Sequence, residues 1–379
     1  MEPVILGIDT SCDETSAAVT TGRRVLSNVI SSQINIHQKY GGVYPALAKR
    51  AHQERIDFVV REALKRAKTA MKRENEVENE NIRPQISKSS FSPPPSHFPL
   101  SAIAVTQGPG LAIALEVGIG KAKELANNHK LPLVAVNHME GHLYSCLAQN
   151  SHGLPKRELG FPTLCLLVSG GHTELVLMKN HGQYQVLGQT LDDACGEALD
   201  KAAKILKLGY PGGPIIERLA LLRQAKSGDK RRGRELKYVL NPPLKEKKNL
   251  NFSYSGLKTQ FLYLVQSLSE KEFGQNLSNL AFSFQEACFE QLIRKTSQAL
   301  AIYHPKTLLV GGGVIANKYL RRLLRRLAKE NNRPVFFPPY QNLFGDNAAM
   351  IGVAAWYKYQ RKEFVENPET LDREPRLSL

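Results

Sequence analysis

The sequence lacks a long hydrophobic run, closely spaced cysteines and a secretory leader. No window approaches about 18 uncharged apolar residues, so we expect no membrane-spanning helix and no membrane association. The start of the chain shows neither a basic-then-apolar signal nor an Arg/Ser-rich leader, which predicts a cytoplasmic location. The cysteines form no Cys-x-x-Cys pair, which argues against a disulfide framework and against a cysteine zinc site. They are Cys12, Cys146, Cys165, Cys195 and Cys288.

Acidic residues are also scarce relative to basic ones. The 379 residues include 51 Lys and Arg against 35 Asp and Glu, a net charge of +16 that would attract a polyanion such as nucleic acid. Basic residues gather in Arg223–Lys248, and a second group recurs at helical spacing. This second group is Lys318, Arg321, Arg322, Arg325, Arg326 and Lys329. A solvated surface is the alternative interpretation of both groups.

Apolar runs alternate with helical periods, which predicts an α/β fold with largely parallel strands in about two domains. Val4–Thr20 and Leu164–Met178 share one pattern: an apolar run, a small polar turn carrying an acid, and a second apolar run. This echo suggests a duplicated nucleotide-binding core, although the spacing alone is a weak signal. Gly311–Gly313 follows another strand, at a position where α/β sheets usually bind ligands but where tight packing turns are as frequent.

Three segments have helical character, and one segment has none. Val43–Lys68 carries an apolar stripe, a helix is expected at about Leu111–His129, and an apolar helix at Ala348–Tyr357. Residues 72–99 pass from Glu/Asn to Ser to Pro and cannot supply a packed face, so we expect a disordered surface insertion without chemistry.

His138 and His142 form the sharpest local feature. At i and i+4 they lie about 40° apart around a helix, so both imidazoles can reach one metal ion, and Gly141 suggests that they begin the helix. Two satisfied or surface histidines are the alternative. A zinc protease would carry its general base at i+1, whereas Glu140 at i+2 lies about 200° from His138 and points away. Two histidines leave a metal short of ligands, and Asp346 is a candidate third ligand, with a helix N-cap as its alternative role.

Nine sequence blocks occur in the order found in the TsaD family, the bacterial enzymes of tRNA threonylcarbamoyladenosine synthesis that were once described as glycoproteases. The chain resembles this family from Val4 to about Tyr357. The blocks are Asp9–Thr15, Gly108–Leu111, Asn137–Leu143, Leu167–Leu175, Asp192–Lys201, Tyr210–Pro214, Phe252–Thr259, Gly311–Asn317 and Asp346–Asn347.

The resemblance implies a two-lobed, actin-like and Hsp70-like α/β fold with duplicated mixed sheets flanked by helices. We expect lobe I at residues 1–133 plus 348–379 and lobe II at 134–347, with the metal-binding and adenylate-binding loops in lobe II. The implied reaction is acyl transfer: the threonylcarbamoyl group moves from threonylcarbamoyl-AMP to the exocyclic amine of adenosine 37, beside the anticodon of ANN-decoding tRNAs, and AMP is released.

The resemblance also implies site residues and partners. His138, His142 and Asp346 match the ligands of one divalent metal ion, iron or alternatively zinc. The positions that match the adenylate site are Leu167, Val168, Ser169, Gly170, Gly171, Asp200, Gly213, Glu217 and Asn317. The expected partners are tRNA, a TsaB-like paralogue and a TsaE-like ATPase.

Several points stay open at the level of sequence. No general base can be assigned, although His172 and Glu14 lie in suitable turns. Phe344-Gly345 departs from the small polar residue that usually precedes the aspartate, so the surroundings of the metal can differ. The alternative functions are a non-catalytic actin-like partner subunit, an ATP-hydrolysing kinase or chaperone of this fold, and a metal-dependent protease.

Overall fold

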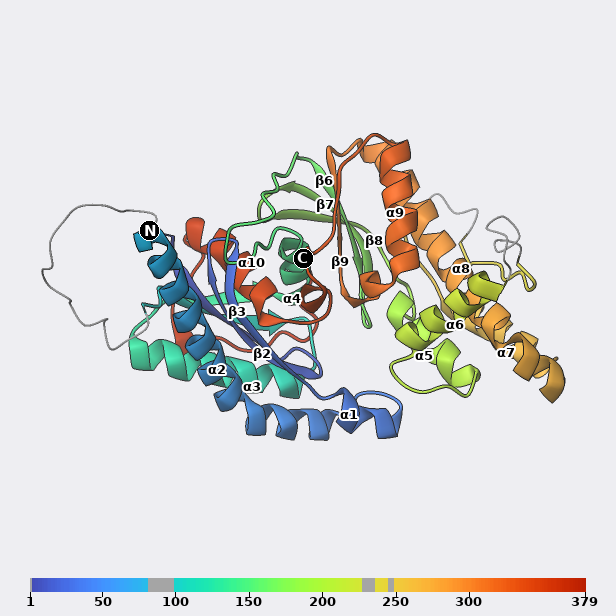
Figure 1. Ribbon diagram of the computed structural model, residues 1–379, viewed down its shortest axis with the longest axis horizontal. Coiled ribbons are helices and arrows are strands. Elements are labelled where there is room, and N and C mark those ends of the chain that lie inside the picture. Colours follow the sequence, from blue (N-terminus) through green and yellow to red (C-terminus); the bar gives the residue numbers. More distant parts are fainter. Residues whose placement is uncertain (1, 81–98, 227–235, 245–248) are drawn as a thin grey trace, which may run out of the picture. The chain divides into compact units, whose positions relative to one another are not determined.

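A computed structural model of the chain describes residues 2–80, 99–226, 236–244 and 249–379. Within these ranges it contains two five-stranded sheets, and the chain divides into two compact units (Figure 1). The first unit comprises Met1–Gln33, Pro45–Arg157 and Asp346–Ser378, and the second comprises Ile34–Tyr44, Glu158–Gly345 and Leu379. Among the helices of the described ranges, none is long and apolar enough to cross a membrane.

The sheet of the first unit has the strand order β3-β2-β1-β4-β5. Its strands are β1 Val4–Asp9, β2 Glu14–Thr21, β3 Arg24–Ser32, β4 Ala102–Gly108 and β5 Leu133–Asn137. β1–β3 form an antiparallel meander, whereas β1 pairs parallel with β4, and β4 with β5. Every residue of β1 is buried, as expected for a central strand that is covered on both faces.

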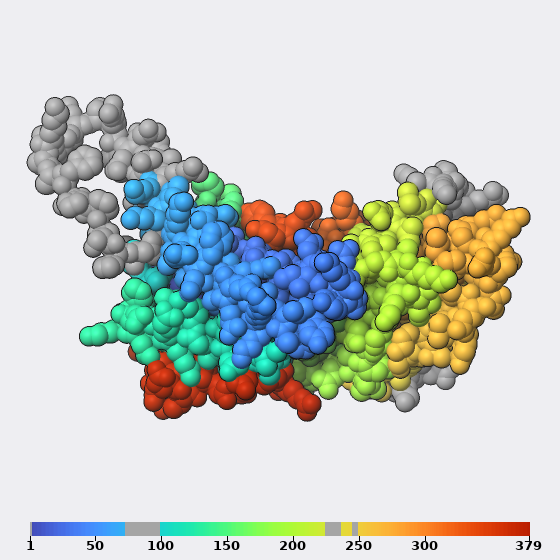
Figure 2. Space-filling model, turned by 90° about the horizontal axis from the view of Figure 1, so that it is seen from below, coloured from blue at the N-terminus to red at the C-terminus, as the bar shows by residue number. Residues whose placement is uncertain are grey.

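Helices cover both faces of this first sheet (Figure 1). They are α2 Pro45–Glu80, α3 Ala112–His129, α4 His138–Ser145 and α10 Ala348–Gln360, followed by the short η5 Pro368–Thr370. α2 and α3 pack on the face that carries Leu6 and Ile8, and Figure 2 shows the two helices side by side on the surface. α10 covers the other face so closely that a Cβ on Gly7 would lie 2.9 Å from the backbone nitrogen of Gly352.

The sheet of the second unit has the strand order β10-β9-β6-β7-β8. Its strands are β6 Thr163–Val168, β7 Thr173–Asn180, β8 Gln183–Gln189, β9 Thr307–Gly311 and β10 Val335–Phe336. β6–β8 form an antiparallel meander, and β6 pairs parallel with β9, and β9 with β10. Both sheets therefore share one topology, which confirms the predicted duplication.

The helices of the second unit pack around a separate apolar core on β6 and β9. They are α5 Cys195–Ile205, α6 Gly212–Lys226, α7 Ser255–Gln266, α8 Glu270–Tyr303 and α9 Lys318–Glu330. Short helical segments are α1 Ile34–His37, η1 Gln38–Tyr40, η3 Gly313–Ala316 and η4 Gln341–Leu343. α8 begins with a capping box, in which Ser269 and Glu272 each bond the backbone of the other.

The first long helix differs from the one predicted. α2 continues to Glu80, whereas the sequence pattern predicted an end near Lys68 and an unstructured segment from Lys72. The extra turns are rich in Lys, Arg and Glu, which favour helix even without an apolar face to pack. The remainder of the expected insertion, residues 81–98, lies outside the described residues.

The boundary between the units also differs from the expected lobes. Residues 134–157 belong to the first unit and not to the second, and this unit resumes at Asp346. The reason is pairing: β5 extends the first sheet beside β4, and Gln149 donates a hydrogen bond from its backbone N–H to the carbonyl of Arg23. The histidine pair is thus part of the first unit.

Candidate metal centre and nucleotide pocket

The two histidines occupy the first turn and the middle of α4, which starts directly where β5 ends. The side chain of Asn137 caps this helix by accepting hydrogen bonds from the backbone N–H groups of Met139 (2.8 Å) and Glu140 (3.3 Å). The backbone conformation at the histidines is therefore fixed by the cap. The prediction that His138 and His142 begin a helix is confirmed.

Asp346 lies just before α10 but does not cap it. Asn347 is the N-cap, and its side chain accepts a hydrogen bond from the backbone N–H of Met350 at 3.1 Å. The N-cap interpretation of Asp346 is therefore wrong. The aspartate instead faces the histidines.

His138, His142 and Asp346 meet in one cluster. One ligand atom of each lies within 4.8 Å of the others. Oδ1 of Asp346 is 3.4 Å from Nε2 of His138 and 3.2 Å from Nε2 of His142, and the two imidazole rings are nearly perpendicular. From the residues alone Asp346 was one candidate third ligand, and the family resemblance assigned it, since no spacing rule links residues about two hundred positions apart.

The chemistry of the cluster suits a divalent cation. Both histidines are buried, yet neither Nδ1 forms a hydrogen bond within the described residues, and each Nε2 faces the carboxylate of Asp346. A buried imidazole nitrogen without a partner is costly, and coordination of a metal removes that cost. Two nitrogens and one carboxylate oxygen match the donor types that iron and zinc accept.

The carboxylates also change the protonation of the cluster. Burial lowers the pKa of His138, but the nearby charges of Asp346 and Asp9 outweigh burial and raise that pKa to about 10. Burial raises the pKa of Asp346, whereas the two histidines lower it well below its usual range. Without a cation the cluster thus holds a proton on His138.

Asp9 is a site residue that the sequence reasoning did not assign. Its Oδ1 lies 3.6 Å from Nδ1 of His138 and accepts a hydrogen bond from the Thr106 hydroxyl at 2.7 Å, while its Oδ2 is buried without a partner in the described residues. A carboxylate behind a ligating histidine orients the ring and raises its basicity. The available signal was the position of Asp9 at the end of a buried strand.

Glu140 points away from the cluster, as predicted. It is buried, and its carboxylate lies 3.8 Å from Nζ of Lys358 and 3.9 Å from Nη2 of Arg361, both at the end of α10. These contacts join α4 to α10 on the side opposite the histidines. The base that a zinc protease requires is therefore absent from the position next to the histidines in this helix.

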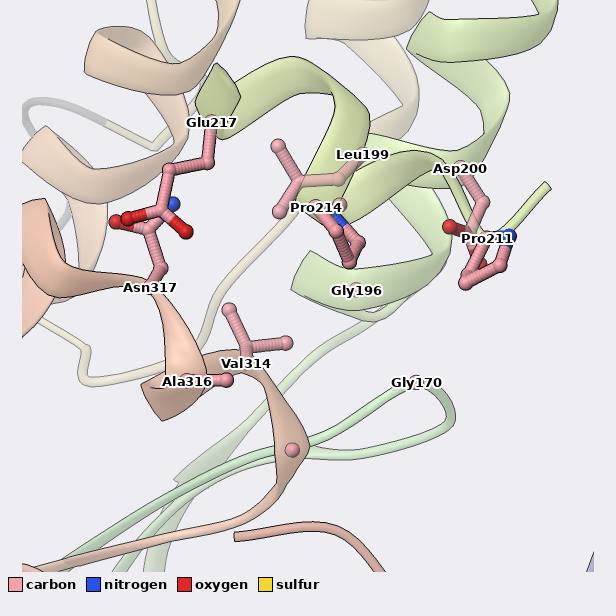
Figure 3. A pocket seen from close by; sticks show the side chains of 12 residues that line it. Gly170, Gly196, Leu199, Asp200, Pro211, Pro214, Glu217, Val314, Ala316 and Asn317 are labelled. Carbon is pink, nitrogen blue, oxygen red and sulfur yellow. The ribbon is translucent and has the colours of Figure 1, made fainter. Parts of the chain in front are cut away.

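The second unit contains a hollow of about 570 Å³, part of it open to solvent. Figure 3 shows Glu217 and Asn317 at one end and Asp200 beside Pro211 at the other. Five of the nine expected adenylate positions line it: Gly170, Asp200, Gly213, Glu217 and Asn317.

The other four positions support the pocket or lie in the turn beside it. Leu167 and Val168 are buried residues of β6, and Ser169 closes the turn by donating its backbone N–H to the carbonyl of His172. The backbone N–H groups of Gly170 and Gly171 take part in no hydrogen bond within the described residues, and a Cβ on either glycine would meet nothing within 4 Å. These two donors are free to approach an anion.

Polar side chains of the pocket are held by its own backbone. Oδ1 of Asp200 accepts a hydrogen bond from the backbone N–H of Gly212, and Oε1 of Glu217 accepts one from Lys318, both at 2.7 Å. Asn317 caps α9 through Oδ1 and donates from Nδ2 to Gln285. Both polar atoms of the Asn317 side chain are therefore engaged within the protein.

Sequence reasoning missed the apolar walls of the pocket. Its further lining residues are Gly196, Leu199, Pro211, Pro214, Gly313, Val314 and Ala316. Gly196 allows the start of α5 to approach, since a Cβ there would lie 2.6 Å from the carbonyl oxygen of Ser169. These lining residues lie within the sequence blocks Asp192–Lys201, Tyr210–Pro214 and Gly311–Asn317, but no role was assigned to them from the sequence.

The two candidates for a general base lie in different units. Burial, Asp13 and Asp346 raise the pKa of Glu14 well above its usual value. His172 lies in the turn after β6, where its backbone N–H donates to the Ser169 hydroxyl at 3.0 Å. These contacts identify neither Glu14 nor His172 as a general base.

Half of the Arg223–Lys248 basic tract, residues 223–226 and 236–244, lies in the described part of the chain. Arg223 donates to Asn279 and covers the ring of Phe282, and Lys237 donates to Asn276. Both side chains are therefore used within the protein. Residues 227–235 and 245–248 lie outside the described residues.

Two sheets with one repeated topology, each flanked by helices, define an actin-like α/β protein. The crystal structure of HypF from T. kodakarensis has the same fold: it superposes with a TM-score of 0.51 at 11% identity, covering 97% of this chain and 48% of that one. At this identity the likeness concerns the fold alone.

The sequence comparisons identify the family within that class. The TsaD family, described as tRNA N6-adenosine threonylcarbamoyltransferase, matches residues 24–77 and 96–353. An enzyme with that description from Desulfitobacterium hafniense (strain Y51) is 43% identical over 99% of this chain and 97% of its own. An enzyme with the same description from Moorella thermoacetica is 41% identical over 100% of this chain and 98% of its own. The chain belongs to the TsaD family, and the unmatched residues 78–95 lie within the predicted insertion.

Proposed function

We propose that this transferase of the TsaD family moves the threonylcarbamoyl group from threonylcarbamoyl-AMP to the exocyclic amine of adenosine 37 in ANN-decoding tRNAs and releases AMP. The observation that carries the proposal is the convergence of His138, His142 and Asp346 from two distant segments. A non-catalytic subunit would not need two buried histidines that face one half-buried carboxylate. The ATPase and protease alternatives are supported by no comparable arrangement.

His138, His142 and Asp346 would hold one divalent metal, iron or alternatively zinc. Such an ion would supply Lewis-acid polarisation and a template for the carbamoyl oxygens. The protein contributes the geometry: the Asn137 cap fixes the helix, and Asp9 lies behind His138. Three protein ligands would leave other coordination positions of the ion open for substrate oxygens.

The adenylate would occupy the pocket of the second unit. The free N–H groups of Gly170 and Gly171 suit phosphate oxygens, while Asp200 and Glu217 suit ribose hydroxyls. Leu199, Val314 and Pro214 supply an apolar wall for a base. The remaining expected positions, Leu167, Val168 and Ser169, would shape the turn, and Gly213 and Asn317 the rim.

The donor carries its own leaving group, so the protein has mainly to position it, stabilise charge and exclude water. An exocyclic adenine amine is a weak nucleophile, and its orientation toward the carbamoyl carbon matters most. The proposal therefore assigns no side chain as general base.

The partners and the location belong to the same proposal. We expect tRNA as the acceptor and assistance from a TsaB-like paralogue and a TsaE-like ATPase. The cytoplasmic location stays a prediction.

Reconstitution tests the proposal directly. The purified chain is combined with threonine, bicarbonate, ATP, an adenylate-forming enzyme and unmodified tRNA, with and without the two partners, and the nucleosides are then analysed by mass. Threonylcarbamoyladenosine that depends on this chain is the expected product. Its absence in every combination, or casein cleavage by the metal-loaded protein, would contradict the proposal.

A further inference from the structure

We propose that one face of α9 is a docking surface for the sugar–phosphate backbone of tRNA. The face, called the α9 ridge below, consists of Lys318, Arg322, Arg325 and Lys329. The inference rests on the proposed function for the identity of the polyanion. What is new is the surface of this chain to which the tRNA would bind.

The spacing places the four cations in one row. Positions i, i+4, i+7 and i+11 lie within about 60° of one another around a helix, and they span roughly 16 Å along its axis. All four residues are exposed. None of them forms an ion pair within the described residues, because Glu330, the sole acid of α9, pairs with Arg326 at 2.7 Å.

Aromatic rings hold the two arginines of the ridge in place. The guanidinium of Arg322 lies 4.9 Å from the ring centre of Tyr319, and that of Arg325 lies 5.2 Å from the ring centre of Phe337. A guanidinium against a ring keeps its edge N–H groups available for phosphate oxygens, and it loses less freedom when it binds. A merely solvated face has no need of this arrangement.

The ridge starts at the wall of the nucleotide pocket. Lys318, its first residue, donates its backbone N–H to Glu217, and Asn317 before it lines the pocket and caps α9. A polynucleotide on the ridge would therefore pass beside the pocket that we assign to the adenylate. Charge complementarity and this position together favour an RNA backbone.

α2 carries a comparable row that serves as a matched control. Arg61, Lys65, Lys68 and Lys72 have the same spacing, and all four are exposed. Glu62 lies within this row and Asp57 lies one turn before it, and the row belongs to the first unit. The α2 row therefore matches the α9 ridge in the number, spacing and charge of its basic residues, but it has acidic neighbours and lies in the other unit.

The test compares the full-length wild-type chain with two fourfold variants. The ridge variant is K318Q/R322Q/R325Q/K329Q, and the control variant is R61Q/K65Q/K68Q/K72Q; glutamine is a good helix former, and urea unfolding checks both folds. Binding of an unmodified ANN-decoding tRNA transcript is measured over a series of salt concentrations. The ridge variant should bind at least about tenfold more weakly at low salt, with a salt slope shallower by about 3, whereas the control variant should resemble the wild type.

Two results would overturn the docking surface: a ridge variant with wild-type affinity and slope, or equal losses in both variants. The binding of AMP to the ridge variant should stay unchanged, since the side chains of the ridge do not line the pocket. Product formation by the wild type is measured in parallel. Failure of that reaction contradicts the proposed function, while equal tRNA binding by an active wild type and the ridge variant contradicts this inference alone.

Discussion

The metal proposal rests on individual residues whose polar atoms have few other partners in the protein. Nδ1 of His142 is buried and has no hydrogen-bond partner in the described part of the chain, an arrangement that costs free energy unless a ligand is bound. Asp346 faces these nitrogens and leaves the capping of α10 to Asn347. Both features are understandable if the cluster binds a cation.

The substitution His142→Ala should abolish both metal retention and transfer. It removes one of three ligands, and the remaining two hold a divalent ion far less tightly. His152→Ala is the control, since that histidine is exposed. Metal content after gel filtration and threonylcarbamoyladenosine yield are the measurements. Full metal content and activity in His142→Ala would rule out the assigned site.

Substitution by Val at two glycines that line the pocket should have different effects: one weakens AMP binding, and the other lowers the stability of the fold. Gly170→Val meets open space, so the free energy of unfolding should change by less than about 0.5 kcal/mol, while AMP binding weakens because the side chain enters the phosphate position. Gly196→Val places its Cβ within 2.6 Å of a backbone oxygen and should cost about 1–3 kcal/mol. Urea unfolding and calorimetric AMP titration measure both effects; wild-type AMP affinity in Gly170→Val would contradict the phosphate assignment.

The sequence predicts those site residues whose pattern lies within one short segment, and it does not predict those that only the fold brings together. The i, i+4 spacing identifies His138 and His142 without any further information. Asp346 required the family resemblance, since its chain separation from the histidines carries no signal. Asp9 was missed, because a buried carboxylate behind a ligand is recognised only from tertiary contacts.

At the scale of elements, the cap of α4 links stability to the site. Asn137→Ala should lower the free energy of unfolding by about 1 kcal/mol and also weaken metal binding, since the cap fixes the first turn that carries His138. Ser269→Ala at the start of α8 removes a comparable cap and should cost a similar free energy without any change in metal affinity. Equal metal affinities in both variants would show that the cap does not position the histidine.

Elements with strong periodicity were predicted well. β1, β2, β6, β7, α3 and α10 agree with the apolar runs and the predicted helices to within a few residues. β8 was not predicted because most of its side chains are exposed and polar, and β10 is only two residues long. Such strands are defined by pairing with a neighbour, which a single sequence does not reveal.

At the scale of the whole molecule, the expected lobe boundary differs from the division in the structure because strand pairing decided it. β5 and the segment after it remain with the first sheet through hydrogen bonds to partners that are distant in sequence. As a result, the metal cluster belongs to the first unit and the nucleotide pocket to the second. Each unit also has its own apolar core.

This division predicts that metal and nucleotide bind independently. AMP lacks the threonylcarbamoyl group and so probes the pocket alone; its affinity in His142→Ala should equal that of the wild type, and the metal content of Gly170→Val should be normal. Calorimetry with AMP and metal analysis test both statements, and the transfer reaction should be lost in either variant. A tenfold change in AMP affinity on removal of the metal ligand would correspond to a coupling free energy of about 1.4 kcal/mol between the sites, and binding at each unit would then depend on the state of the other.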